Sequence, residues 1–387
     1  MSERAAIAVI GGGVIGASIA HHLALEGVRD IVVIDRASSP GMGSTGKATG
    51  GFRAQFATSI NVRLSLIARE KLLRFHDETG VDPGYCPVGY LWLASTESQL
   101  DAIRAGQIVQ KQEGLAEVRE LAPGEIRSVN PLITIDGVIG AAFCPTDGYI
   151  RPLEILRGYL ESAERLGVKF KWENECVGLR TDSNGRITKV ITTDRSIDVD
   201  TVVNAAGPWA ARVARMAGVL LPVVPLRRQA AFTVPCPAIP ADMPMTIFMD
   251  RGFHLRARDG RAMLCWPNPE EPGEPDDLRA DPEWIDAVAA MARERVPVLR
   301  GVDIDRELCY AGLYEMSPDD HAIVGVPADC ENMHLANGSS GHGVMHSPAI
   351  GQLVADLIVF KTPDLDISPL RPSRFDEDAP VAAAELI

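Results

Sequence analysis

The first part of the chain is organised as short apolar runs separated by glycine-rich turns. An apolar run covers Ala5–Ile10, an apolar-faced helical stretch follows, and a second apolar run covers Ile31–Ile34. Gly27 stands after the helical stretch, where glycine commonly ends a helix. Because two strands joined by one helix pair in parallel, the pattern predicts a β-α-β unit.

The turn between this strand and helix has three glycines at fixed spacing, Gly11, Gly13 and Gly16. The first allows a tight turn, the second lets the backbone approach a pyrophosphate, and the third allows close packing of helix on strand. Asp35 ends the second strand, about twenty residues on, where a carboxylate accepts hydrogen bonds from a ribose. We therefore expect a bound dinucleotide. The alternative is a glycine-rich turn in another kind of α/β protein.

The same stretch has no charged residue from Ala5 to Leu25, as in a signal peptide or a membrane span. Three consecutive glycines and two histidines are poorly suited to hydrocarbon, so we expect no membrane span and a cytoplasmic location.

Periodicity along the rest of the chain predicts a succession of helices and strands. Expected helices cover residues 60–78, 97–112, 282–295 and 350–360, with one more entered through Pro152. Expected strands cover residues 88–94, 168–172, 177–180, 187–192 and 197–206. The glycine-rich residues 38–51 indicate irregular structure, and residues 222–267 are typical of short antiparallel strands broken by prolines.

This organisation predicts an α/β fold in two domains. A Rossmann-like nucleotide-binding domain with a central parallel sheet would comprise residues 1–85, 146–222 and 308–371. A second, mainly antiparallel-sheet substrate domain would comprise residues 86–145 and 223–307, followed by a C-terminal tail, 372–387. We expect the ligands between the domains, at the carboxyl ends of the parallel strands.

Composition narrows the possible partners. The chain has 387 residues and a formal net charge of −14, which argues against nucleic acid and anionic membranes as partners. A local arginine can still bind an anionic small molecule. The seven cysteines are odd in number and lack CxxC pairing, so neither a disulfide framework nor a metal site is expected.

Four further segments favour a flavin over a nicotinamide, and one of them comprises residues 311–314 and 317–320. Residues 43–48 offer backbone N–H groups and two hydroxyls as a second cradle for a long cofactor, although a flexible surface loop is the alternative. Residues 202–209 form a buried strand that ends in small residues, which allow close approach to a cofactor. Residues 337–345 are a glycine-rich loop before a helix, which stabilises negative charge on a reduced flavin.

With these motifs and with AGLYEMSPDDHAIVG at 311–325, the chain resembles the FAD-dependent amine and amino-acid oxidoreductases. That family includes sarcosine oxidase, glycine oxidase and D-amino-acid oxidase. The chain is similar in particular to the β subunits of heteromeric sarcosine oxidases and of L-proline dehydrogenases, from Ile7 to about Ile358.

The resemblance implies a set of FAD-binding positions. They are Gly11, Gly13, Val14, Ile15, Asp35, Arg36, Ser44, Thr45, Lys47, Ala48, Val177, Ala206, Gly207, Trp209, Gly312, Gly338, Gly341, His342, Gly343, Val344 and Met345.

Departures from the family pattern indicate that the FAD is not covalently attached. Monomeric sarcosine oxidases attach FAD through a cysteine two residues before a tyrosine, and Gly312 takes that place before Tyr314. The histidine that attaches a flavin in heterotetrameric relatives corresponds to Pro152. A lysine that pairs with the substrate carboxylate in monomeric relatives corresponds to Met345.

Three residues are candidates for the chemistry. Arg53 can grip a substrate carboxylate through two parallel hydrogen bonds, and it occupies the place where sarcosine oxidases hold the substrate acid; an interdomain ion pair is the alternative. Gln55 is a weaker polar candidate. His342 is expected to contact flavin or substrate, unless it only bonds backbone. His254 lies where relatives often place a substrate-facing tyrosine, and a structural role is the alternative.

The implied activity is oxidation of the C–N bond of a small secondary amine or amino acid of the sarcosine, proline or opine type. A hydride equivalent passes to flavin N5 and the resulting imine is hydrolysed. The electron acceptor is oxygen or a partner protein. The alternative functions are a flavoprotein subunit that is active only with a partner chain and, less favoured, a nicotinamide-dependent reductase.

Overall fold

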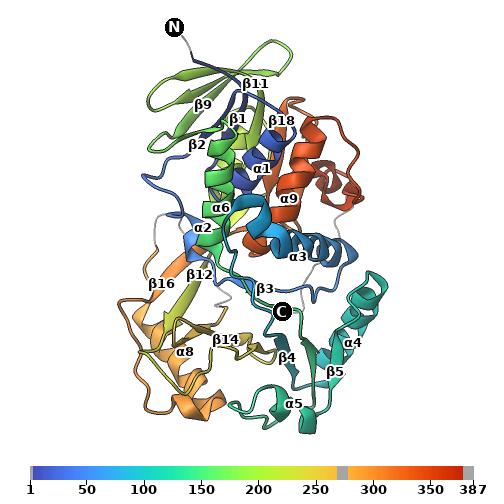
Figure 1. Cartoon of the computed structure of the whole chain (residues 1–387), viewed down its shortest axis with the longest axis vertical. Coiled ribbons are helices and arrows are strands. Elements are labelled where there is room, and N and C mark those ends of the chain that lie inside the picture. Colours follow the sequence, from blue (N-terminus) through green and yellow to red (C-terminus); the bar gives the residue numbers. More distant parts are fainter. Residues whose placement is uncertain (1–2, 268–277, 378–387) are drawn as a thin grey trace.

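The computed structural model describes residues 3–267 and 278–377, which form two bodies, each built on an eight-stranded sheet. The bodies lie one above the other along the long axis of the molecule (Figure 1). Two predicted segments, 268–277 of the substrate domain and 378–387 of the tail, lie outside the described residues. The fold is α/β, as predicted.

The upper body contains the predicted β-α-β unit at its centre. Strand β1 pairs in parallel with β2 and with β11, and β11 pairs in parallel with β18, so the middle of this sheet is parallel. Antiparallel strands β9, β10 and β17 extend it. The strands are β1 Glu3–Ile10, β2 Ile31–Ile34, β8 Lys169–Lys171, β9 Cys176–Thr181, β10 Ile187–Thr192, β11 Ser196–Asn204, β17 Ile323–Gly325 and β18 Met333–Asn337.

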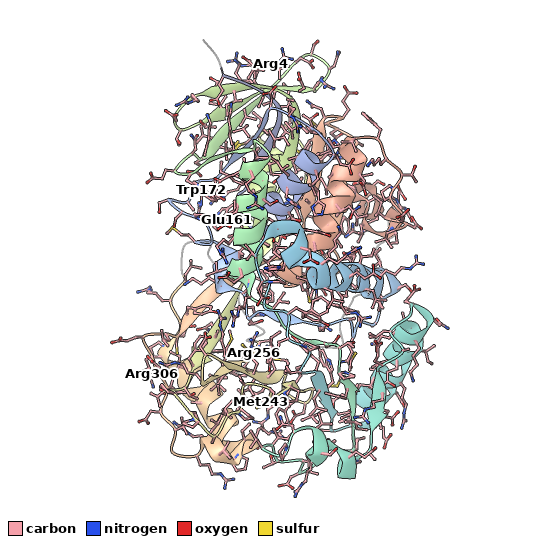
Figure 2. All side chains as sticks on the ribbon, in the orientation of Figure 1. Arg4, Glu161, Trp172, Met243, Arg256 and Arg306 are labelled. Atoms are coloured by element: carbon pink, nitrogen blue, oxygen red, sulfur yellow. The ribbon has the colours of Figure 1, made fainter. Side chains whose placement is uncertain are left out.

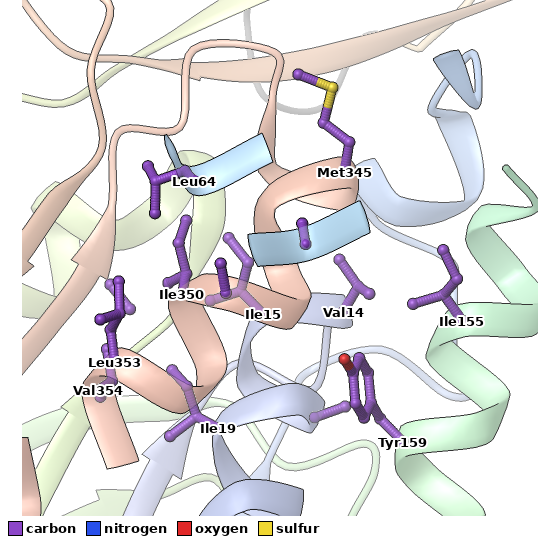
Figure 3. Close-up of a cluster of buried hydrophobic side chains, with 14 of the residues drawn as sticks. Val14, Ile15, Ile19, Leu64, Ile155, Tyr159, Met345, Ile350, Leu353 and Val354 are labelled. Carbon is purple, nitrogen blue, oxygen red and sulfur yellow. The ribbon is translucent and has the colours of Figure 1, made fainter. Parts of the chain in front are cut away.

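Four helices pack together beside this sheet and enclose an apolar core (Figure 3). They are α1 Val14–Leu25, α3 Ser59–Thr79, α6 Pro152–Arg165 and α9 Gly343–Ile358. Helices α1 and α9 approach very closely, since a Cβ added to Gly351 would lie 2.0 Å from Ser18 Oγ. The same hydroxyl donates a hydrogen bond to the Ser347 carbonyl. This packing fixes the start of α9 next to the turn between β1 and α1.

The lower body is a mixed sheet in the order β16-β12-β15-β14-β13-β4-β6-β5. All its pairings are antiparallel except that of β13 with β4. The strands are β4 Tyr90–Ala94, β5 Arg119–Leu121, β6 Gly140–Cys144, β12 Val224–Phe232, β13 Met245–Phe248, β14 Phe253–Arg258, β15 Arg261–Cys265 and β16 Tyr310–Met316. Helices α4 Glu97–Gln112, α5 Pro123–Val129 and α8 Pro282–Arg295 belong to this body.

The structure differs from the predicted division at two places. Strand β16 lies within the segment 308–371 assigned to the nucleotide-binding domain, yet it pairs with β12 in the lower sheet. The predicted tail begins with a packed turn in which Arg374 is completely buried. Its guanidinium donates to Asp319 at 2.8 and 3.0 Å, so Asp319 serves a structural ion pair.

Two local predictions need correction. The glycine-rich residues 38–51 are not wholly irregular, because they contain the one-turn helix α2 Ser44–Lys47 and lead into the short strand β3 Gly51–Phe52, which pairs with β7 Gly148–Tyr149. Helix α9 begins at residue 343 instead of 350. The helix passes through Pro348, because the Ser347 hydroxyl donates to the Val344 carbonyl, which a proline cannot bond.

Candidate functional site

A cavity of about 930 Å³ lies between the two bodies. Its wall is formed by the β1–α1 turn, the end of β2, α2, the 3₁₀ turn Gly207–Trp209 and the start of α9. Strands β12, β14 and β16 of the lower body complete it. All the predicted cofactor-binding residues line this cavity except Val177 and Gly338. Val177 is half exposed, and its neighbours Glu175 and Cys176 take its place in the wall.

The glycines of the first turn are required for different reasons. Gly11 has φ +110°, and a Cβ there would lie 2.2 Å from the Ala205 carbonyl oxygen. A Cβ on Gly16 would lie 1.9 Å from the Gly11 carbonyl oxygen. Gly13 is different, because its nearest neighbour would be Thr45 Oγ1 at 3.4 Å. The protein itself therefore leaves room at Gly13, which is consistent with a ligand approaching there.

Asp35 is placed at the carboxyl end of β2 and holds the turn. Its two oxygens accept hydrogen bonds from the Gly12 and Ala37 N–H groups, at 2.7 and 2.8 Å. A carboxylate has about four acceptor positions, so it can also accept from a ribose hydroxyl. Next to it, the Arg36 guanidinium lies 4.0 Å from the centre of the Trp209 ring.

Helix α2 forms the second cradle beside the first turn. Thr45 Oγ1 accepts a hydrogen bond from the Val14 N–H at 3.1 Å, which joins α2 to the start of α1. The Lys47 ammonium lies 4.8 Å from the centre of the Tyr310 ring. Lys47 therefore also contacts the lower body, at the strand that carries Gly312.

Arg256 connects the two bodies below this cradle, as its position in Figure 2 shows. From β14 it donates hydrogen bonds to the carbonyls of Thr49 and Gly50, at 2.8 and 2.7 Å. Its guanidinium also stacks on the Tyr149 ring at 3.6 Å. The loop between α2 and β3 is thereby fixed against the lower sheet.

Several polar atoms in the cavity wall are buried without a hydrogen-bond partner. They are Ser44 Oγ, Trp92 Nε1, Asn174 Oδ1, Trp209 Nε1, Tyr310 OH, Glu315 Oε2 and Ser339 Oγ. Folded proteins satisfy most buried polar groups, so a cluster of unsatisfied ones in one cavity fits a polar ligand. Their distribution from both cradles to the start of α9 fits an extended cofactor such as FAD.

Arg53 lies half-buried in the wall of the cavity beside aromatic rings. Its guanidinium lies 4.0 Å from the centre of the Phe56 ring and 5.0 Å from that of Trp92. It donates to the Gln55 carbonyl at 2.7 Å, and no acidic side chain within 3–267 or 278–377 forms an ion pair with it. Burial lowers its pKa to about 10, so it remains charged at neutral pH.

Asp147, which the sequence analysis did not single out, supports the loop that carries Arg53. It is fully buried and accepts hydrogen bonds from the Ala54 N–H and the Gln55 amide, at 2.7 and 3.0 Å. The Gln55 amide also donates to the Tyr90 carbonyl. Gln55 therefore positions Arg53 instead of facing the substrate. The feature of the sequence that could have indicated Asp147 is an acidic residue followed by Gly148, between two apolar segments.

His342 contacts Arg53 at the N-terminal end of α9. Its Nε2 lies 3.1 Å from an Arg53 nitrogen. Because a guanidinium only donates, Nε2 accepts and the imidazole is neutral with its proton on Nδ1. Burial and the charge of Arg53 lower its pKa well below the ordinary value. His342 thus orients Arg53 from the cavity wall.

His254 faces the cavity from β14 in the lower body. Its Nδ1 donates to the Gly252 carbonyl at 2.9 Å, which leaves Nε2 as the acceptor. Burial lowers its pKa, as do the charges of Arg53 and Arg228. A neutral imidazole with a free acceptor nitrogen can accept a hydrogen bond from an amine N–H. The remaining wall of this part, which the sequence did not indicate, is Tyr90, Trp92, Met245, Ile247, Cys265 and Tyr314.

Within 3–267 and 278–377 there is no cluster of histidine, cysteine and acidic residues that could hold a metal ion. No helix in those ranges is sufficiently long and apolar to span a bilayer.

Residues 6–357 match the family model described as DAO, FAD dependent oxidoreductase. The chain is 29% identical to FAD-dependent oxidoreductase domain-containing protein 1 of Xenopus laevis, over 100% of this chain and 85% of that protein. It is also 29% identical to mitochondrial dimethylglycine dehydrogenase of Rattus norvegicus, over 96% of this chain but only 45% of that protein.

Among solved structures, L-proline dehydrogenase from P. horikoshii is similar with a TM-score of 0.91 and 29% identity, over 98% of this chain and 100% of that one. The predicted family resemblance is thereby confirmed. The rat relative is mitochondrial by name, so the cytoplasmic location expected for this chain stays a prediction.

Proposed function

Because the chain belongs to the FAD-dependent oxidoreductase family, we propose that it oxidises the C–N bond of a small N-alkyl or cyclic amino acid. Sarcosine, proline and opines are of this class. Two similar proteins are named for dimethylglycine and proline, which share a carboxylate and an alkylated nitrogen. The observation that carries the proposal is Arg53, a cation in the cavity wall without an acidic partner among the residues described.

The residues of the chain divide the work between cofactor and substrate. FAD, when bound, accepts the hydride equivalent removed from the carbon next to the substrate nitrogen. Arg53 would hold the substrate carboxylate through two parallel hydrogen bonds while His342 and the Gln55 carbonyl fix its guanidinium. His254 Nε2 would accept a hydrogen bond from the substrate nitrogen, which must be present as the free amine to be oxidised.

The aromatic wall around Arg53 has a further role. Trp92, Tyr90 and Met245 are each less than a tenth exposed and line the cavity. Their burial excludes water from the place where the substrate would lie, and this strengthens the attraction between Arg53 and a carboxylate. The oxidised product, an imine, is hydrolysed by water.

The substrate class can be tested with a panel of amines under anaerobic conditions. Sarcosine, proline, an opine and simple amines without a carboxylate are each mixed with the oxidised protein. We expect loss of the yellow absorbance with at least one N-alkyl amino acid. Loss only with amines that lack a carboxylate would contradict the proposal.

The FAD is expected to be released intact when the protein is denatured. Gly312 lines the cavity but has no side chain to form a bond, and Pro152 begins α6 outside the cavity wall. After precipitation with acid, all the flavin should be in the supernatant. Yellow colour that remains in the washed pellet would show a covalent bond.

We expect the reduced protein to react slowly with oxygen. A cation beside the flavin favours oxygen reduction because it stabilises the superoxide that forms first. Lys47 is the lysine in the described cavity wall, and it lies against Tyr310. His254 is kept neutral by burial, and Arg256 is bonded to two backbone carbonyls outside the wall.

The measurement is stopped-flow mixing of the substrate-reduced protein with air-saturated buffer. Reoxidation slower than turnover with an artificial acceptor indicates a dehydrogenase. Reoxidation as fast as turnover would make the protein an oxidase.

The alternative function is a flavoprotein subunit that needs a partner chain. The match with rat dimethylglycine dehydrogenase covers 45% of that protein, so a related domain occurs there with a large additional segment. Turnover of the isolated chain with an artificial acceptor would exclude a requirement for a partner. A flavin that substrate cannot reduce in the isolated chain would favour it.

A further inference from the structure

One acidic side chain in the cavity wall has no part in the proposed reaction. Glu315 lies on β16, lines the cavity and is 8% exposed. Its Oε1 accepts a long hydrogen bond of 3.3 Å from the Ser339 N–H, and its Oε2 is buried without a partner. A buried carboxyl oxygen without a donor is costly, so a ligand in the cavity is the natural partner.

The surroundings of Glu315 do not favour its ionised form. Helix α2 and strand β12 pack against β16 and carry Lys47, Arg227 and Arg228, and His342 lies in the adjacent loop. None of these forms an ion pair with Glu315; Lys47 lies on Tyr310 and Arg227 pairs with Asp281. The turn Gly207–Trp209, which also packs against β16, contains no charged residue.

Burial accordingly raises the pKa of Glu315 to about 7, although the nearby polar groups of Ser339 and Gly338 oppose the shift. Burial thus favours the neutral carboxylic acid over the carboxylate at this position. A neutral acid has an O–H donor that the carboxylate lacks.

We propose that Glu315 contacts the bound FAD as a neutral carboxylic acid that donates a hydrogen bond from Oε2. Two effects favour this form when the cavity is filled. The cofactor removes remaining water from the carboxyl group, and its negatively charged pyrophosphate repels a carboxylate. FAD binding is therefore coupled to a proton on Glu315. The inference depends on FAD occupying the cavity and not on which amine is oxidised.

The test measures the dissociation constant of FAD from the apoprotein, with the loss of flavin fluorescence as the signal for binding. The measurement is repeated at several values between about pH 5.5 and 8.5, the range in which the side chain of Glu315 changes its charge. The wild-type dissociation constant should be constant at low pH. Above the pKa of Glu315, about 7, it should rise by up to about tenfold per pH unit, because one proton is taken up with FAD.

Two variants separate Glu315 from other causes. Glu315→Gln keeps the shape and an N–H donor without a charge, so its dissociation constant should stay near the low-pH wild-type value throughout. Glu331→Gln removes the same charge at an exposed position and should keep the wild-type dependence on pH. A wild-type constant that does not change with pH, or the same rise in Glu315→Gln, would overturn the inference and leave the proposed amine oxidation standing.

A second measurement does not depend on the stability of a variant. Infrared difference spectra of wild-type protein at about pH 8, where most unperturbed carboxyl groups are ionised, should show a carboxylic-acid carbonyl band that appears when FAD binds. Its absence would contradict a neutral Glu315 in the holoprotein.

Discussion

Arg53→Ala is expected to lower kcat/KM for an N-alkyl amino acid by about 30-fold or more while the FAD content is unchanged. Losing one partner of a buried, hydrogen-bonded charge pair costs roughly 2–5 kcal/mol, because the other charge is left without compensation. Arg53 has the geometry for such a pair, since it lies between Phe56 and Trp92 in the cavity wall. Steady-state kinetics with an artificial acceptor measure the effect.

The control for Arg53→Ala is a second substrate that lacks the carboxylate. An amine that matches the amino acid but lacks the carboxylate should be oxidised equally poorly by the wild type and by Arg53→Ala, since the interaction is absent in both cases. Arg53→Lys keeps the charge and loses the paired hydrogen bonds, so its kcat/KM for the amino acid should lie between that of the wild type and that of Arg53→Ala. If both substrates lose the same factor in Arg53→Ala, the residue has a structural role and the anchor assignment fails.

Gly16→Ala is expected to destabilise the protein by about 3 kcal/mol and to reduce its FAD content, because overpacking a close backbone contact costs on the order of 1–3 kcal/mol or more. The added Cβ would lie 1.9 Å from the Gly11 carbonyl oxygen and 3.3 Å from Val9 Cγ1. Neither backbone can move without separating α1 from β1. Thermal unfolding of the apoprotein and the flavin-to-protein absorbance ratio measure the two effects.

Gly13→Ala provides the comparison that separates folding from binding. Its Cβ meets only Thr45 Oγ1, at 3.4 Å, and its φ of −71° suits any residue. The apoprotein should therefore unfold at the wild-type temperature, whereas FAD should bind more weakly. A Cβ added at Gly124 has no atom within 4 Å, so Gly124→Ala, in helix α5, should lower neither the unfolding temperature nor the affinity for FAD. Wild-type FAD affinity in Gly13→Ala would show that the cofactor does not approach this turn.

Much of the local structure could be read from the sequence. The helices 97–112 and 282–295 and the strand 187–192 have the predicted bounds. The β1–α1–β2 unit and the position of Asp35 at the end of β2 are also as predicted. These features depend on hydrogen bonds and apolar faces within a few residues or turns, and periodicity reports them directly.

Two element predictions failed where neighbours decide the conformation. Helix α2 forms within a glycine-rich run because Gly46 must pack on the Gly41 carbonyl, only 2.0 Å from where a Cβ would be. Helix α9 passes through Pro348 because Ser347 compensates for the missing hydrogen bond. The sequence shows the glycines and the proline, but it does not show the packing of Gly46 or the hydrogen bond of Ser347 that allow a helix at these places.

The sequence by itself determined the family, the cofactor and the glycine-rich turn proposed to hold its phosphates, because these depend on motifs that are continuous in the chain. Only the tertiary structure decided the surroundings of Arg53, which come from Phe56, Trp92 and His342. It also decided that Asp147 supports the Arg53 loop and that Glu315 lines the cavity with its Oε2 buried without a partner. Except for the contact between Arg53 and Phe56, these contacts join segments far apart in the chain, and no local pattern encodes which distant side chains will meet.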